Sequence, residues 1–117
     1  MKTVFIVNPK AGQGKDTEKF IADIKRIADK LNLDTEIYRT KAVGDATVFV
    51  RDYCEKYGVA RFIACGGDGT LGEVVNGAIE HNEAEVGIIP LGTGNDFAGI
   101  SRRTIAFQTL KHSLQEK

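Results

Sequence analysis

Short apolar runs alternate with amphipathic segments along this chain of 117 residues, and that alternation narrows the folds it can adopt. Four runs are typical of strands: residues 4–7, 35–39, 61–65 and 86–89. Apolar residues recur at helical spacing in the segments between them. Strictly alternating strands and helices predict an α/β fold, a three-layer, Rossmann-like parallel sheet with helices on both faces.

Cap and turn residues indicate where the first two helices begin and end. The first helix is expected over residues 16–32. For the second, Gly44-Asp45 offers an N-cap and Gly58 ends the helix. Its apolar stripe contains Ala46, Phe49, Val50, Tyr53 and Tyr57.

A capping pattern indicates the start of the third helix. Thr70 and Glu73 have the Thr-x-x-Glu spacing of a capping box, which predicts that the helix begins at Thr70. Its apolar face contains Leu71, Val74, Val75, Ala78 and Ile79. The helix is expected to end near residues 81–82, and a last helix is predicted over residues 103–115.

The charge balance argues against nucleic acid as a partner. Sixteen basic and sixteen acidic side chains cancel, so no strongly anionic surface is expected to be the main partner. The two cysteines, Cys54 and Cys65, are too few for a disulfide framework or a metal site and are expected to be reduced, structural thiols. The N-terminal apolar run is too short for a signal peptide or a membrane span, which favours a cytoplasmic location.

Unusual loops follow three of the predicted strands. They are residues 8–12, 66–70 and 92–96, and each contains glycine. Ligands of parallel α/β sheets bind beyond the carboxyl ends of the strands. The coincidence of three such loops therefore predicts a binding site at that edge of the sheet.

The loop over residues 66–70 has the features of a phosphate site. Gly66, Gly67 and Gly69 leave backbone N–H groups uncovered next to a helix N-terminus, where the helix dipole favours anions. The alternative is a tight strand-to-helix turn that needs glycine only for positive φ angles. Asp68 carries a negative charge into the same loop, which makes sense if a divalent cation lies between it and a phosphate.

Two better-known glycine motifs do not match. Gly67-x-Gly69-x-x-Gly72 has the spacing of the dinucleotide fingerprint, but the acidic residue expected about 20 positions later is missing. Residues 12–16 resemble a Walker loop that lacks its first glycine and has Asp16 in place of Ser or Thr. Cysteine and histidine positions give no zinc pattern, and His81 and His112 are expected to be solvated helix residues.

The loop over residues 92–96 repeats the pattern one strand later. Thr93 offers a hydroxyl and Asn95 an amide, while Gly94 admits a ligand to the backbone. Asp96 supplies a second carboxylate, which is expected to lie near Asp68. The alternative is an Asn/Asp-rich turn held by side-chain-to-backbone hydrogen bonds.

Four spaced motifs together resemble a known family. They are Asn8-Pro-x-x-Gly12, Thr40 ahead of Gly44-Asp45-Ala46, Gly66-Gly-Asp-Gly-Thr70 and Gly92-Thr-Gly-Asn-Asp96. In this order, and over nearly the whole chain, they are similar to the diacylglycerol kinase catalytic domain family, which includes sphingosine and ceramide kinases. The resemblance implies the N-terminal domain of the NAD kinase/diacylglycerol kinase-like fold.

The resemblance also implies an activity and a set of site residues. The activity is transfer of the ATP γ-phosphoryl group to a lipid hydroxyl, with Mg²⁺. The residues implied to bind the nucleotide are Asn8, Thr40, Gly66, Gly67, Asp68, Gly69, Thr70, Leu71, Gly72, Thr93, Gly94 and Asn95. Asp68 would organise the metal and phosphate, and Asp96 would contribute to the same catalytic network.

The chain departs from the family pattern in two ways. Gly72 stands where many bacterial members have Asn, which weakens the helix by about 1 kcal/mol relative to Ala. Family members also continue into a β-rich domain that supplies the lipid pocket, further Mg²⁺ ligands and the catalytic base. Residues 1–117 are therefore expected to form the nucleotide-binding domain alone and to be inactive without the second domain.

Several alternatives stay open at this point. NAD kinases share the Gly-Gly-Asp-Gly-Thr motif, although Asn8-Pro9 and residues 92–96 favour the lipid-kinase branch. A non-catalytic nucleotide-binding module and a dinucleotide-binding protein are two further hypotheses. Expected partners are ATP and a lipid alcohol, at most peripheral contact with the inner membrane surface, and either a second copy or the missing C-terminal domain.

Overall fold

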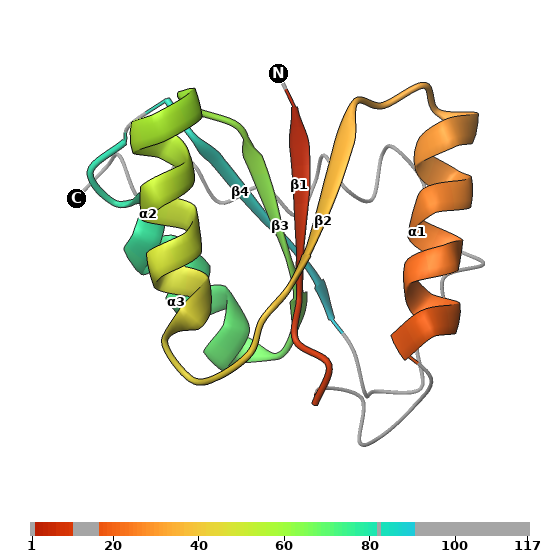
Figure 1. Cartoon of the computed structure of the whole chain (residues 1–117), viewed down its shortest axis with the longest axis horizontal. Coiled ribbons are helices and arrows are strands. Elements are labelled where there is room, and N and C mark those ends of the chain that lie inside the picture. The colour runs from red at the N-terminus through yellow and green to blue at the C-terminus, as the bar shows by residue number, and fades with distance from the viewer. Residues whose placement is uncertain (1, 11–16, 82, 91–117) are drawn as a thin grey trace.

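A computed structural model of the chain describes residues 2–10, 17–81 and 83–90. The elements, labelled in Figure 1, are β1 (Thr3–Val7), α1 (Thr17–Lys30), β2 (Thr35–Arg39), α2 (Asp45–Tyr57), β3 (Arg61–Gly66), α3 (Asp68–Ala78) and β4 (Glu85–Pro90). All four predicted strands and the first three predicted helices are confirmed. The predicted helix over residues 103–115 and the loop over residues 92–96 lie outside the described residues.

The four strands form one parallel sheet in the order β2-β1-β3-β4. In its register, Val7 pairs with Arg39 on one side and with Cys65 on the other. The carboxyl ends of β1, β2 and β3 therefore lie at the same edge of the sheet, as the sequence predicted.

Helices cover both faces of the sheet, α1 on one side and α2 with α3 on the other (Figure 1). Alternate strand residues point to opposite faces. Towards α1 the core contains Phe5, Val7, Ile63, Cys65 and Ile89 with Phe20, Ile21 and Ile24. Towards α2 and α3 it contains Val4, Ile6, Phe62, Ala64 and Val86 with Val50, Tyr53 and Val74. The predicted three-layer architecture is confirmed.

The two cysteines lie on opposite sides of this core. Cys54 packs with the α2 and α3 face and Cys65 with the α1 face. Both are buried and free, as predicted. Burial raises the pKa of the Cys65 thiol well above its ordinary value, so the thiol stays protonated.

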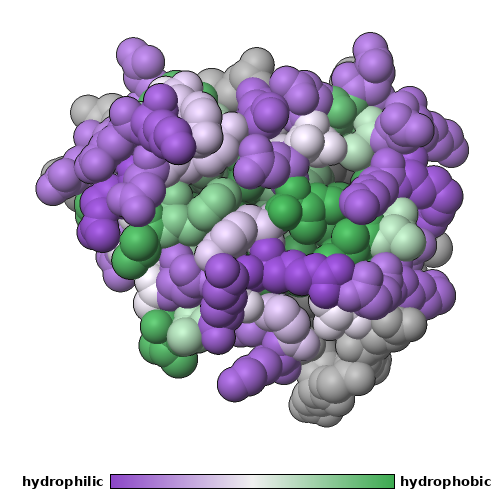
Figure 2. All heavy atoms as spheres, viewed as in Figure 1, coloured by the Kyte–Doolittle hydropathy of each residue, from purple (hydrophilic) through white to green (hydrophobic). Residues whose placement is uncertain are grey.

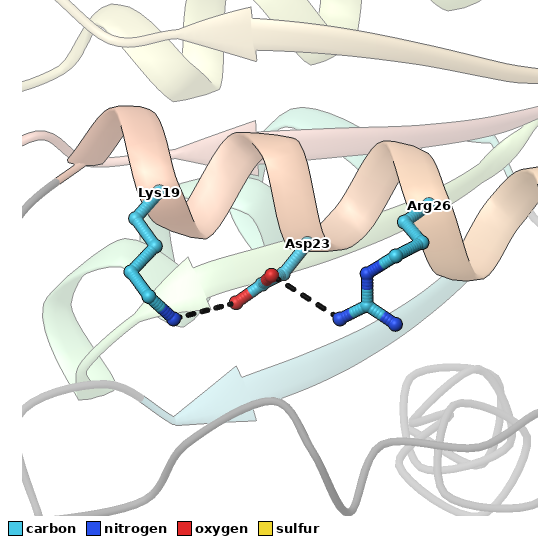
Figure 3. Close-up of polar contacts among 3 residues, drawn as sticks. All are labelled: Lys19, Asp23 and Arg26. Atoms are coloured by element: carbon cyan, nitrogen blue, oxygen red, sulfur yellow. Dashed lines mark hydrogen bonds and ion pairs between the residues drawn. The ribbon is translucent and has the colours of Figure 1, made fainter.

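Helix α1 is amphipathic and ends in a recognisable cap. On its exposed side Asp23 bridges two cations, with Lys19 at 3.6 Å and Arg26 at 3.2 Å (Figure 3). At its C-terminus the Leu33 N–H donates to the Ala28 carbonyl at 2.8 Å, the 6→1 bond of a Schellman motif. Asn32 occupies the left-handed position of that motif, at a φ of 57°.

Close contact between α2 and α3 depends on a glycine. The Thr47 hydroxyl donates to the Glu73 carbonyl at 2.7 Å. A Cβ on Gly77 would lie 2.6 Å from the Thr47 carbonyl oxygen and 2.8 Å from the Val50 Cβ. Any larger residue at position 77 would therefore push the two helices apart.

Two predicted core residues are exposed. Tyr57 was placed in the apolar stripe of α2, and Ile79 on the apolar face of α3, but they are 66% and 56% exposed. Both lie at the C-terminal end of a helix, since Gly58 caps α2 and Ile79 is itself the C-cap of α3. Helical spacing predicts a buried face only as far as the helix has a neighbour to pack against. Helix α3 also ends earlier than the expected residues 81–82.

The surface of the layers is mostly polar. Figure 2 shows hydrophilic side chains over the outer faces of the helices. Apolar side chains gather between the helices and the sheet, on both sides of the sheet. Ile27, Leu33 and Ile37 are partly buried hydrophobics on the α1 side. Within the described residues, no helix is long and apolar enough to cross a membrane.

Candidate functional site

Three chain segments meet at the carboxyl edge of the sheet. The Thr40 N–H donates to the Val7 carbonyl at 2.9 Å, and the Asn8 N–H donates to the Cys65 carbonyl at 3.2 Å. These bonds continue the parallel ladder one residue beyond the strands. Thr40, Asn8 and Gly66 therefore lie side by side, which brings three of the predicted site residues together.

Asn8 connects two of the segments through its side chain. Its Oδ1 accepts a hydrogen bond from the Lys10 N–H at 3.0 Å, which closes the turn after β1. Its Nδ2 lies 3.4 Å from the Thr70 hydroxyl oxygen, to which it donates a long hydrogen bond. Asn8, the residue that directly follows β1, is thus a tertiary link between the first loop and α3.

Helix α3 begins two residues earlier than predicted, at Asp68, with Gly67 as its N-cap. The predicted capping box is therefore wrong. Thr70 lies inside the first turn, because the Leu71 N–H already donates to the Gly67 carbonyl at 3.1 Å. The Thr70 side chain is buried, 7% exposed, and contacts Asn8 instead of capping the helix.

None of the glycines among residues 66–72 adopts a positive φ angle. Among the glycines that the structure describes, only Gly44 and Gly58 have positive φ, and Gly67 has a φ of −106° that any residue can adopt. The alternative of a tight turn that needs glycine for its backbone angles is therefore wrong.

Packing accounts for one of these glycines and not for the others. A Cβ on Gly66 would lie 2.5 Å from the Thr70 hydroxyl oxygen, so a larger residue there would displace the Thr70 side chain. A Cβ on Gly67, Gly69 or Gly72 would meet none of the residues that the structure describes within 4 Å. At these three positions the missing side chain leaves the backbone open to an approaching ligand.

The first turn of α3 presents backbone donors in this open region. Its first helical hydrogen bond is donated by Leu71, so the N–H groups of Asp68, Gly69 and Thr70 precede the ladder. Residues 67–69 are exposed. Unpaired N–H groups and the positive end of the helix dipole together favour anions, phosphate above all.

Asp68 is the predicted metal ligand, and it lies exposed in the first turn of α3. No group of three or more metal-binding side chains occurs among the residues that the structure describes. Thr93, Gly94, Asn95 and Asp96 lie outside those residues. The predicted approach of Asp96 to Asp68 therefore stays a prediction.

Sequence reasoning missed the role of Asp45 at this edge. Its Oδ2 accepts hydrogen bonds from the Lys41 N–H and the Tyr38 hydroxyl, both at 2.8 Å. Burial, and then the hydrogen bond to Asp45, raise the pKa of Tyr38. The sequence signal that could have indicated this contact is the position of Tyr38 near the end of a strand, seven residues before Asp45.

Comparison with known proteins identifies the family. Residues 2–112 match the diacylglycerol kinase catalytic domain. The chain belongs to this family. It is 43% identical over 94 residues to the diacylglycerol kinases of Staphylococcus saprophyticus and of Staphylococcus aureus strain MRSA252. These alignments cover 79% of this chain and 30% and 29% of those relatives.

The fold agrees with that of a solved member. A diacylglycerol kinase from Bacillus anthracis strain Sterne superimposes with a TM-score of 0.60 at 35% identity, over 99% of this chain and 42% of that one. The predicted NAD kinase/diacylglycerol kinase-like fold is therefore confirmed. The chain spans less than a third of the length of the curated diacylglycerol kinases it matches.

Proposed function

We propose that this chain is the ATP-binding domain of a lipid kinase that transfers the γ-phosphoryl group of ATP to the hydroxyl of a diacylglycerol-like lipid. Family membership supports the reaction class. The observation that carries the proposal is the open turn at the start of α3. There, neither the packing of the described residues nor a positive φ requires glycine at positions 67 and 69, and residues 67–69 are exposed.

Each predicted residue has a proposed place around the nucleotide. The amides of residues 67–70 hold the phosphates, and Leu71 and Gly72 extend that turn. Asn8 and Thr40 flank it from the neighbouring strand ends. Thr93, Gly94 and Asn95 complete the proposed set from the segment after β4. Phosphoryl transfer needs mainly positioning and neutralisation of charge, which backbone donors supply.

Asp68 is proposed to support Mg²⁺ bound to the triphosphate. Mg²⁺ takes oxygen ligands and usually binds through one or two carboxylates together with substrate phosphates and waters. Asp68 is exposed at the helix end where the phosphates are proposed to bind, so its carboxylate can reach such an ion. Asp96 is proposed to contribute to the same network.

In the proposed reaction the lipid hydroxyl oxygen bonds to the γ-phosphorus while the bond from that phosphorus to the β–γ bridging oxygen breaks. ADP leaves, and the hydroxyl proton passes to a base. Because the relatives are much longer than this chain, we place that base and the lipid pocket outside residues 1–117. The chain alone is then a nucleotide-binding module without detectable lipid phosphorylation.

Calorimetric titration tests this proposal. The chain should bind ATP weakly and in a Mg²⁺-dependent manner, and the variant Asp68→Ala should lose most of that Mg²⁺ dependence. Asp29→Ala, which removes an exposed carboxylate from α1, is the control and should bind as the parent does. Binding of NADH equal to or tighter than that of ATP would contradict the proposal, and so would Mg²⁺ dependence that survives in Asp68→Ala.

A further inference from the structure

The segment that connects β2 to α2 has little apolar packing to hold it. Lys41, Ala42 and Val43 are all exposed, and Val43 is 97% exposed. Thr40, directly before them, lies beside Asn8 at the carboxyl edge of the sheet. Something other than burial must therefore fix the chain where it leaves this position.

The carboxylate of Asp45 supplies that attachment. The ladder of the sheet ends with the Thr40 N–H, which donates to Val7. The next donor, the Lys41 N–H, turns away from the sheet and donates to Asp45 Oδ2 at 2.8 Å. A hydrogen bond to an ionised acceptor is about twice as strong as one between neutral groups. Asp45 thus holds the residue next to Thr40.

The same carboxylate is itself held from both sides. The Tyr38 hydroxyl donates to Asp45 Oδ2 at 2.8 Å, and the Tyr38 ring stacks on Phe49 of α2 with centroids 3.8 Å apart. On the other side, Gly44 turns the chain into α2 at a φ of 89°, a left-handed angle that favours glycine. The Asp45 N–H also donates to the Ala42 carbonyl at 3.1 Å.

We propose that Asp45 is a positioning residue for the nucleotide site, acting through Thr40. Its carboxylate joins the end of β2 to the start of α2 and so keeps Thr40 beside Asn8 before nucleotide arrives. A group held in place in advance costs less conformational entropy when the ligand binds. This inference rests on the proposed function of the site. It assigns Asp45 a role in nucleotide affinity in addition to its place as the first residue of α2.

The test compares three variants by titration with Mg·ATP. Asp45→Ala should weaken binding by about tenfold, because small displacements of positioning groups have effects of at least this size. Asp45→Asn keeps an oxygen acceptor and should recover most of the loss. Asp52→Ala removes an exposed carboxylate from the same helix and should bind as the parent does.

A double-variant comparison separates positioning from a general loss of structure. If Asp45 acts through Thr40, then Thr40→Ala combined with Asp45→Ala should bind about as weakly as Thr40→Ala alone. Fully additive losses would overturn the proposal. Unchanged binding by Asp45→Ala would also overturn it and would leave the proposed ATP site intact.

Amide hydrogen exchange without nucleotide keeps the two proposals distinguishable. In Asp45→Ala the Lys41 amide should exchange at least tenfold faster, a rough expectation for loss of its hydrogen bond, while amides of β3 stay protected. Unchanged exchange at Lys41 would overturn the role of Asp45 whatever the chain binds. If the parent binds no ATP at all, the proposed function fails, and the role of Asp45 in affinity fails with it.

Discussion

The side-chain amide of Asn8 lies 3.4 Å from the hydroxyl of Thr70, although 62 positions separate them in the sequence. Asn8 follows β1, and Thr70 lies in the first turn of α3. Because Gly66 has no side chain, Thr70 can lie against it and reach Asn8. Two motifs that are far apart in the sequence are thus parts of one site.

Replacement of Asn8 should weaken nucleotide binding. Asn8→Ala removes the bond to Thr70 and the acceptor for the Lys10 N–H, each worth about 0.5–1.5 kcal/mol. We expect a loss of affinity for Mg·ATP of about tenfold, measured by calorimetry. Asn76→Ala, at an exposed position of α3, is the control. Equal affinities of the two variants would show that Asn8 has no part in the site.

Gly66 and Gly67 should respond to alanine in opposite ways. A methyl group at position 66 would collide with the Thr70 side chain, so Gly66→Ala should lower the free energy of unfolding by about 1–3 kcal/mol. At position 67 the methyl group meets no atom of the described part of the chain within 4 Å. Gly67→Ala should therefore stay within about 0.5 kcal/mol of the parent in stability.

The same pair separates folding from binding. Gly67→Ala places its methyl group in the open space that we assign to the phosphates, so this variant should fold normally and bind Mg·ATP more weakly. Denaturant unfolding and calorimetry on the two variants measure both effects. A Gly67→Ala variant that binds like the parent would show that the open space is not where the nucleotide approaches.

Two glycines within α3, Gly72 and Gly77, give a second contrast, in stability alone. Gly77→Ala should destabilise the chain by about 1–3 kcal/mol, because its Cβ would overlap Thr47 and Val50 of α2. In Gly72→Ala the new methyl group meets no neighbour among the residues with described positions, so the variant should stabilise the helix by up to about 1 kcal/mol. Urea unfolding checks both signs. Equal effects at positions 72 and 77 would mean that α2 and α3 are not packed as described.

The buried thiol of Cys65 should make stability depend on pH in the alkaline range. Burial raises its pKa above the ordinary 9.0, so the unfolded chain releases this proton at a lower pH than the folded chain. The contribution of the protonated Cys65 thiol to the free energy of unfolding is complete below pH 9. It is lost as the pH rises above 9, by at most about 1.4 kcal/mol per pH unit.

The variant Cys65→Ala separates the effect of this thiol on stability from that of the tyrosines, which ionise in a similar pH range. The variant should show a smaller decrease in unfolding free energy between pH 8 and pH 10, roughly the interval that brackets the ordinary thiol pKa. Unfolding curves at several pH values measure the difference. Parallel curves for parent and variant would contradict the burial of Cys65.

The secondary structure and the sheet were predictable because their signals are local. Val4-Phe5-Ile6-Val7 is apolar throughout, and the helical stripe that includes Phe20 and Ile24 repeats without interruption, so each element is specified by its own residues. Helix ends were less predictable. The Thr70-x-x-Glu73 pattern was present, but the Asn8 side chain and the Gly66 surface decided where Thr70 lies.

The site was predictable as a location and only partly as a set of contacts. The topology of a parallel sheet brings Asn8, Thr40 and Gly66 to one edge, and the sequence pattern was enough to expect that. The sequence could not show that Gly66 is required by Thr70 while Gly67 is open. Nor could it show that Asp45 bonds to Tyr38, since that contact depends on the left-handed turn at Gly44.

The most direct test of the central claim is an amide chemical-shift titration of the chain with Mg·ATP. Binding of phosphates at the start of α3 predicts that the largest shifts occur at the amides of residues 67–70, with smaller shifts at Asn8 and Thr40. Amides in the last turn of α1, on the far side of the sheet, should not move. Largest shifts away from residues 67–70, or no shifts at all with saturating Mg·ATP, would contradict the account.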